Sequence, residues 1–207
     1  MAIAEIKTGY LATSDGAVNT ARSDKSNALV TVDGHGRYQE SVYRGNVFTA
    51  SLQSSTAVTN LATTATGLIL SNPAGSGKNL VLLELLLAQT STAAASANAA
   101  IVLAANVNPN AAATVHTTSL TVRNALLGSS IGSVGFADSA ATLPVAPVVV
   151  RTIWQPSVSA TATTAIPPFI KDEIAGALLV APGCTVSLSA FGAISVIATI
   201  TWEEIPV

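Results

Sequence analysis

The residues that come nearest to a chemical motif lie between Asn72 and Asn79, where Gly75-Ser76-Gly77-Lys78 matches the end of a phosphate-binding loop. Such a loop has the pattern G-x-x-x-x-G-K-[ST], in which main-chain N–H groups surround the phosphates and the final hydroxyl holds Mg²⁺. Asn72 occupies the position of the first glycine and Asn79 that of the hydroxyl, so the magnesium ligand is missing. We therefore interpret the segment as a β-connection between two buried strands, with Lys78 as an exposed turn lysine.

A second formal match, Gly128-Ser129-Ser130-Ile131-Gly132, has the G-x-S-x-G pattern of the nucleophile elbow of α/β-hydrolases. That arrangement needs an acid and then a histidine after the serine, whereas His35 and His116 both precede Ser130. A catalytic triad in another order would belong to a different fold, for which nothing else in the sequence argues. We interpret the match as a flexible Gly/Ser loop.

Two groups of charged residues have the residue types that acid–base chemistry or cation binding uses. Glu203 and Glu204 are adjacent, so on a strand they point to opposite faces and do not form a working carboxylate pair. The cluster Lys171-Asp172-Glu173 is interpreted as a solvated turn.

The tryptophans and the single cysteine are interpreted as interior residues. We expect Trp154 and Trp202 in the core, rather than as a platform on which a sugar stacks. Cys184 is expected to be a small buried apolar residue, because one cysteine and two histidines make a poor structural zinc site. The sequence therefore predicts no catalytic residue, no cofactor and no metal.

The composition predicts a surface that is covered by Ser, Thr and Asn or hidden against other subunits, and we favour the second as a large contributor. Charged residues are 10% of the 207, against about 25% in an ordinary soluble domain, and the mean hydropathy is +0.53. The net charge of −2 gives no basic footprint for nucleic acid. The densest apolar run, Leu80 to Ala88, contains Glu84 and is far shorter than the roughly 20 residues that cross a membrane. The opening residues also lack the basic start and apolar core of a signal peptide. We expect no nucleic-acid partner and no membrane.

The elements that must position these residues are predicted to be strands behind an N-terminal arm. Residues 1–26 have sparse apolar residues and no sustained period, which is typical of an extended arm that is ordered only on a partner. In residues 27–42, alternating positions flank Asp33-Gly34, which predicts a short hairpin. The domain boundaries are therefore set at 1–45 for the arm with its hairpin and 46–207 for the domain.

The domain is predicted to be all-β, a jelly-roll-like antiparallel β-sandwich. Short strand patterns recur with turns between them, and the expected strands are 47–51, 57–61, 67–71, 79–89, 101–107, 114–122 and 143–154. We expect 79–89 to be buried on both faces, although its leucines also allow a helix over 80–105. Pro182-Gly183 predicts a type II turn, after which residues 185–202 alternate as a terminal antiparallel hairpin around Gly192.

Three stretches resemble a family of small tailed-bacteriophage virion proteins, the head decoration (cement) proteins with an N-terminal arm and a jelly-roll domain. They are Asp33 to Ala50, Gly67 to Leu87, and Leu179 to Gly183 together with the closing Ile200 to Pro206. The resemblance implies a non-enzymatic homotrimer that ties neighbouring shell subunits together in the virion, assembled in the host bacterial cytoplasm. The implied partners are further copies of the chain and the phage major capsid protein or another virion protein.

Two points stay open at this stage. The alternative function is a receptor- or glycan-binding module of a tail fibre, so the sequence does not decide between a head and a tail component. The arm is expected to reach its partner by strand addition or through Ile3, Ile6, Tyr10 and Leu11.

Overall fold

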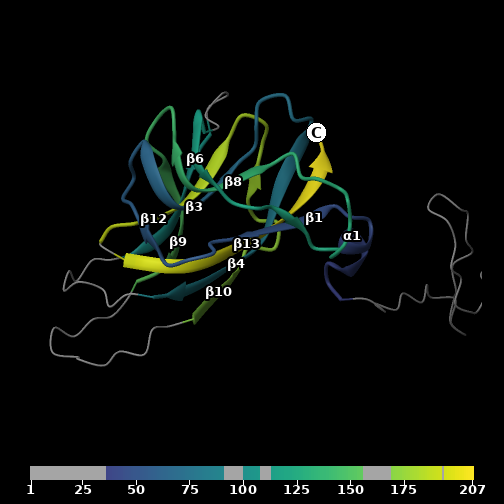
Figure 1. The fold of residues 1–207 in the computed structure, drawn as a ribbon, viewed down its shortest axis with the longest axis horizontal. Coiled ribbons are helices and arrows are strands. Elements are labelled where there is room, and N and C mark those ends of the chain that lie inside the picture. Colours follow the sequence, from purple (N-terminus) through teal and green to yellow (C-terminus); the bar gives the residue numbers. More distant parts are fainter. Residues whose placement is uncertain (1–35, 91–99, 108–112, 156–168, 193) are drawn as a thin grey trace, which may run out of the picture. The chain divides into compact units, whose positions relative to one another are not determined.

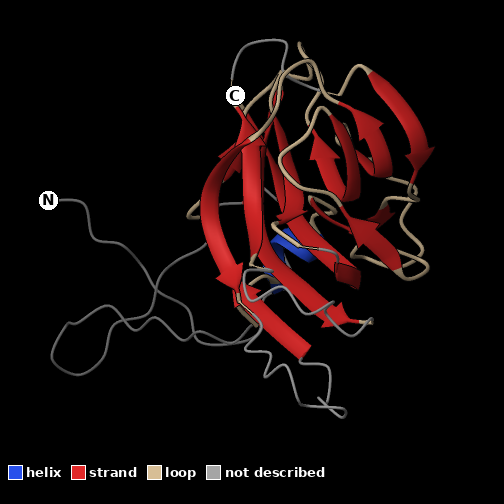
Figure 2. Cartoon of the chain, turned by 90° about the vertical axis from the view of Figure 1, so that its left-hand side faces the viewer, coloured by secondary structure: helices blue, strands red, loops and turns tan. Residues whose placement is uncertain are grey.

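A computed structural model of the chain describes residues 36–90, 100–107, 113–155, 169–192 and 194–207. The chain divides into two compact units, residues 1–40 and residues 41–207, and the strands of the described residues lie in the second. That second unit contains two antiparallel sheets packed as a sandwich, which confirms the all-β fold class (Figures 1 and 2). The jelly-roll connectivity and the extended arm stay predictions.

The first sheet has seven strands in the order β10-β4-β13-β1-β7, with β11 also paired to β4 and β2 to β13. Its strands are β1 (Val47–Ser51), β2 (Thr56–Val58), β4 (Lys78–Gln89), β7 (Arg123–Asn124), β10 (Phe169–Glu173), β11 (Leu179–Val180) and β13 (Ile194–Pro206). The second sheet has six strands in the order β6-β8-β3-β12-β5-β9. Its strands are β3 (Thr64–Ser71), β5 (Ile101–Asn106), β6 (Val115–Ser119), β8 (Phe136–Thr142), β9 (Val148–Trp154) and β12 (Thr185–Ala190).

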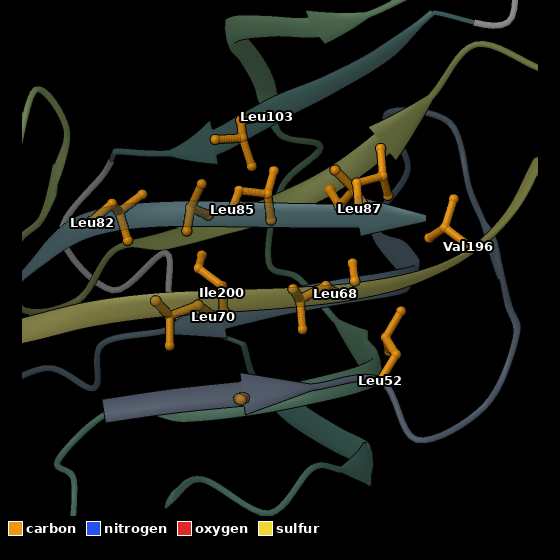
Figure 3. Packing of buried hydrophobic residues seen from close by; sticks show 14 of the residues in the cluster. Leu52, Leu68, Leu70, Leu82, Leu85, Leu87, Leu103, Val196 and Ile200 are labelled. Atoms are coloured by element: carbon orange, nitrogen blue, oxygen red, sulfur yellow. The ribbon is translucent and has the colours of Figure 1, made fainter. Parts of the chain in front are cut away.

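The core lies between the two sheets and is built from aliphatic side chains. On β13 the residues Ile194, Val196, Ala198, Ile200 and Trp202 are buried, because alternate positions of a strand share one face. Facing side chains from both sheets meet in one cluster, among them Leu82, Leu85 and Leu87 from β4 and Leu103 from β5 (Figure 3).

Residues 78–89 form the strand β4 and not a helix, as expected. Only one face of this strand is fully buried, however. Leu80, Leu82, Leu85 and Leu87 are buried, whereas the residues between them, except Leu83, remain partly exposed. The sequence did not indicate this difference in burial between the two faces, because both faces of β4 carry apolar residues. The expectation of equal burial on both faces is therefore corrected.

The hairpin predicted for residues 27–42 is wrong in its second half. Residues Gln39–Tyr43 form the helix α1, so the alternation of Tyr38, Glu40 and Val42 is not that of a strand. Gln39 Oε1 accepts a hydrogen bond from the Gly36 N–H at 3.1 Å, and the Gln39 N–H donates to the Gly36 carbonyl. The Gln39 side chain thus supplies the half of a capping box that returns to the main chain, while the Gly36 carbonyl accepts the first turn's hydrogen bond. These local hydrogen bonds favour a helical turn over the strand that three alternating residues indicated. The first half of the predicted hairpin lies outside the described residues.

The predicted terminal hairpin is also wrong, although both of its strands exist. β12 pairs with β3 and β5 in the six-stranded sheet, while β13 pairs with β4, β1 and β2 in the other. The chain therefore changes sheet between residues 190 and 194. An alternating pattern shows which face of a strand is buried but does not specify the neighbour with which it pairs.

The outer face of the six-stranded sheet is covered at its central strands by the chain's own connections. Leu143 packs with Ile69 in a small second cluster, and Asn106 Nδ2 donates to the Val145 carbonyl at 2.8 Å. Residues 143–147 thus cross from β8 to β9 over this face, which shortens the predicted strand 143–154 to Val148–Trp154. Thr185 and Ser187 of β12 are buried beneath such cover, so β12 has no exposed residue.

Candidate functional site

Lys78 forms an ion pair with a buried carboxylate, so the interpretation of an exposed turn lysine is corrected. Its Nζ lies 3.0 Å from Glu204 Oε2, and the Glu204 side chain is fully buried. The other carboxylate oxygen accepts hydrogen bonds from Ser133 Oγ at 2.5 Å and from the Val134 N–H at 2.9 Å. One carboxylate on β13 therefore holds the start of β4 and the loop before β8 together. This is a structural role, since all the donors come from the chain itself.

The loop before Lys78 has a conformation that its glycines permit, but it does not form a phosphate site. Gly75 and Gly77 have φ values of 76° and 70°, which favour glycine. The cation that would meet a phosphate is already bonded to Glu204. The connection also joins strands of different sheets, β3 and β4, and so serves as a crossover between the layers.

The arrangement that most resembles catalytic chemistry joins His116 on β6 to Asp138 on β8. His116 Nδ1 lies 2.6 Å from Asp138 Oδ2, and Ser119 Oγ donates to Asp138 Oδ1 at 3.1 Å. The Asp138 side chain is fully buried, while the imidazole keeps 32% of its surface exposed. A buried carboxylate that holds an imidazole through Nδ1 is the orienting half of a triad.

The nucleophile of such a triad is missing among the described residues. Ser119 bonds to the carboxylate instead of to the imidazole, and no hydrogen bond of the described chain joins His116 to Ser130. Asp138 thus has its hydrogen bonds supplied by β6, and the group ties an edge strand to its sheet. Sequence reasoning did not find this pair. The sequence signal that could have indicated it is Asp138, the one carboxylate within the small-residue run Ala137 to Ala141. A charge that is buried there requires a partner.

The cluster Lys171-Asp172-Glu173 is part of strand β10 and is not the turn that was predicted. Glu173 lies directly opposite Glu84 of β4, and Lys171 Nζ lies 3.4 Å from Glu84 and 3.5 Å from Glu173. The hydrogen bond to Glu84 is the main reason why the pKa of Lys171 is raised. The ammonium offsets the repulsion between the two opposed carboxylates.

Asp172 connects the two sheets at one lateral edge of the sandwich. Arg151 of β9 donates to it through Nε and Nη2, both at 2.8 Å, in the two-pronged geometry that a guanidinium offers a carboxylate. The hydrogen bond to Asp172 raises the pKa of Arg151 above its ordinary value. Since β9 and β10 belong to different sheets, this pair spans the gap between them.

The tryptophans are not a sugar-binding platform. Trp202 is fully buried, and its ring stacks on Phe48 at 6.2 Å between centroids, as expected for a core residue. Trp154 is half-buried and packs against the same cluster. Cys184 is only partly buried, which corrects the expectation of full burial, and desolvation raises the pKa of its thiol.

The proposed arm contacts Ile3, Ile6, Tyr10 and Leu11 lie outside the described residues. The described residues contain no group of three or more His, Cys, Asp or Glu that could hold a metal ion. Among the same residues, the structure has no helix long and apolar enough to cross a membrane.

No family model, curated protein or solved structure matches the chain.

Proposed function

We propose that the chain is a non-enzymatic structural protein whose copies assemble with one another. The observation that carries this proposal is the exposure of large apolar side chains on the described domain. Leu127 is 85% exposed, Tyr43 77%, Val148 69% and Phe169 68%. These exposed apolar side chains, in a chain of which only 10% of the residues are charged, support a surface that other subunits cover.

The particular assembly that we propose is a phage virion. On the resemblance given above, the chain is a capsid decoration (cement) protein that forms a homotrimer and ties neighbouring shell subunits together. Its partners are then further copies of itself and the major capsid protein or another virion protein. Its place is the virion, after assembly in the host bacterial cytoplasm.

Mass in solution tests the assembly. Light scattering coupled to gel filtration, at micromolar concentration, is expected to give three chain masses for the purified protein. A stable and soluble monomer at that concentration would contradict the proposal, because the exposed apolar side chains would then need no partner.

The alternative, a receptor- or glycan-binding tail-fibre module, has weaker support. The burial of Trp202 removes the pair of tryptophans on which a sugar could have stacked. A glycan array with the purified multimer separates the two functions. Tight and selective binding of one glycan class would favour the alternative, and the absence of selective binding would favour a shell protein.

A further inference from the structure

The two edges of the six-stranded sheet, β6 and β9, are open in the described chain. All five residues of β6 are exposed. On β9, Val148, Val149 and Val150 are 69%, 36% and 43% exposed, so three consecutive apolar residues meet solvent on both faces of the strand. An open edge presents unpaired N–H and C=O groups to any strand of another chain.

The edges of the seven-stranded sheet are protected in ways that β6 and β9 are not. β10 carries Lys171, Asp172 and Glu173, and β7 consists of Arg123 and Asn124 alone. Charged residues and short length are the usual devices that keep an edge strand from pairing with another chain. Apart from Arg151, β6 and β9 carry no Lys, Arg, Asp or Glu, so by charge they are the less protected edges of the sandwich.

The charges near β6 and β9 are engaged within the subunit. Arg151 is the charged residue of β9, and its guanidinium is bonded to Asp172 of the same chain. On β6 the imidazole of His116 is held by the buried Asp138. Both strands have register irregularities with their inner neighbours, which twist an edge but place no charge on it. Two copies therefore approach each other at these edges without repulsion between like charges.

The direction of the strands determines how the edges fit. Every neighbouring pair in the order β6-β8-β3-β12-β5-β9 is antiparallel. With six strands in this order, β6 and β9 run in opposite directions. If β9 of one copy lies beside β6 of the next in the same orientation, the antiparallel alternation continues across the contact.

We propose that β9 of one copy pairs with β6 of a second copy and so extends the six-stranded sheet from subunit to subunit. Each copy gives one β9 and one β6, and three such contacts close a ring. The contact covers Val148 and Val150 together with Val115 of β6, which is 53% exposed. This inference rests on the proposed function, because it names the surface through which the assembly forms.

Disulfide trapping tests the contact in the full chain. In a Cys184→Ala background, Thr117→Cys on β6 is combined in turn with Val148→Cys, Val150→Cys or Thr152→Cys on β9. At least one pair is expected to give a covalent trimer on a non-reducing gel, whereas each single variant stays a monomer on that gel. The matched control combines Thr117→Cys with Phe169→Cys on β10, which is 68% exposed and should not cross-link.

Charge substitution gives a second measurement that does not depend on the cross-linking register. Val149→Lys and Thr118→Lys place a lysine on each edge and are each expected to raise the dissociation constant at least tenfold. Phe169→Lys, the control on the other sheet, should leave the assembly intact. Circular dichroism of each variant shows whether the strands are retained.

The failures of the two proposals can be told apart. A multimeric wild-type chain whose edge-lysine variants stay multimeric, and whose cysteine pairs do not cross-link, overturns the β9–β6 contact but leaves the proposed function. Cross-linked dimers of Val150→Cys alone also overturn it, since they show β9 pairing with itself. Loss of the multimer on deletion of residues 1–26, without cross-linking of any β9–β6 pair, would assign the contact to the arm. A monomeric wild-type chain overturns both proposals.

Discussion

At the scale of single residues, buried carboxylates connect elements that are distant in the chain. Glu204 joins β13 to Lys78 and to the loop at Ser133, while Asp138 joins β8 to His116 of β6. A buried charge is stable only when partners satisfy it, so loss of one partner costs more than loss of an exposed pair. The chemistry at these residues therefore serves the fold, and substitutions there should be read as changes in stability.

The first prediction concerns Lys78. Since its partner is buried, we expect Lys78→Ala to lower the free energy of unfolding by about 1–2 kcal/mol, more than an exposed lysine would. Glu204→Ala should cost about 3 kcal/mol, because it leaves the Ser133 hydroxyl and main-chain N–H groups without their acceptor. Urea denaturation measures both, with Lys171→Ala as the comparison for a lysine whose carboxylate partners, Glu84 and Glu173, are accessible to solvent. Equal midpoints for Lys78→Ala and the wild type would show that the ion pair contributes nothing.

The second prediction concerns the reactivity of Cys184. Desolvation raises the pKa of its thiol in the folded chain, so the thiolate forms at higher pH than in the unfolded chain. The folded chain therefore binds its proton more tightly, and this contribution to stability is lost as pH rises through the folded-state pKa. Iodoacetamide labelling followed across alkaline pH should show a profile displaced upward from that of the chain in urea. Coincident profiles would contradict the burial of the thiol.

At the scale of elements, β3 shows how one backbone position controls the close approach of two strands. Gly67 has a φ of 123° and lies within the register shift between Thr66 and Ile69. A Cβ at this position would lie 3.2 Å from the Leu188 carbonyl oxygen of β12. Glycine is needed there both for its conformation and for the space it leaves.

The third prediction tests that requirement. Gly67→Ala should lower the free energy of unfolding by about 2–3 kcal/mol, because it adds a contact with main-chain atoms to the conformational strain. Gly75→Ala is the matched control, since Gly75 also has a positive φ but no atom within 4 Å of the added Cβ. The control should cost about 1 kcal/mol. Thermal denaturation that gives equal losses for both variants would mean that the contact at Leu188 relaxes without cost.

At the scale of the whole molecule, the sandwich is a self-contained unit. Residues 41–207 cluster together by their contacts, and one large apolar cluster joins their two sheets. Residues 1–26 have few apolar side chains to offset an ordering entropy of about 1–2 kcal/mol per residue. Folding of the domain should therefore be separable from the attachment that we propose for the arm.

The fourth prediction follows from this separation. Deletion of residues 1–26 should leave the thermal midpoint of the domain almost unchanged, as measured by calorimetry. Under the proposed function, the same deletion should abolish incorporation into the larger particle. A truncated chain that fails to fold would make the arm part of the core. One that incorporates normally would show that the arm is not the attachment.

The sequence by itself determined the all-β class and most of the strand positions. Alternation marked the buried face of β13, and Pro182-Gly183 marked a turn in which Gly183 has a φ of 83°. These properties are local, because the period of a strand and the conformation of a turn depend on neighbouring residues. Composition likewise indicated that no ordinary charged surface covers the molecule.

Only the tertiary structure decided which strands pair and which charges meet. β12 and β13 are consecutive and alternate alike, yet they lie in different sheets. His116 meets Asp138 across 22 positions, and Lys78 meets Glu204 across 126. The physical reason is that strand pairing and ion pairing depend on distance in space, which the packing of the two sheets fixes and the local pattern of residues does not. A lysine beside two glycines therefore matched a phosphate loop in the sequence, while in the fold its partner is a buried carboxylate of the last strand.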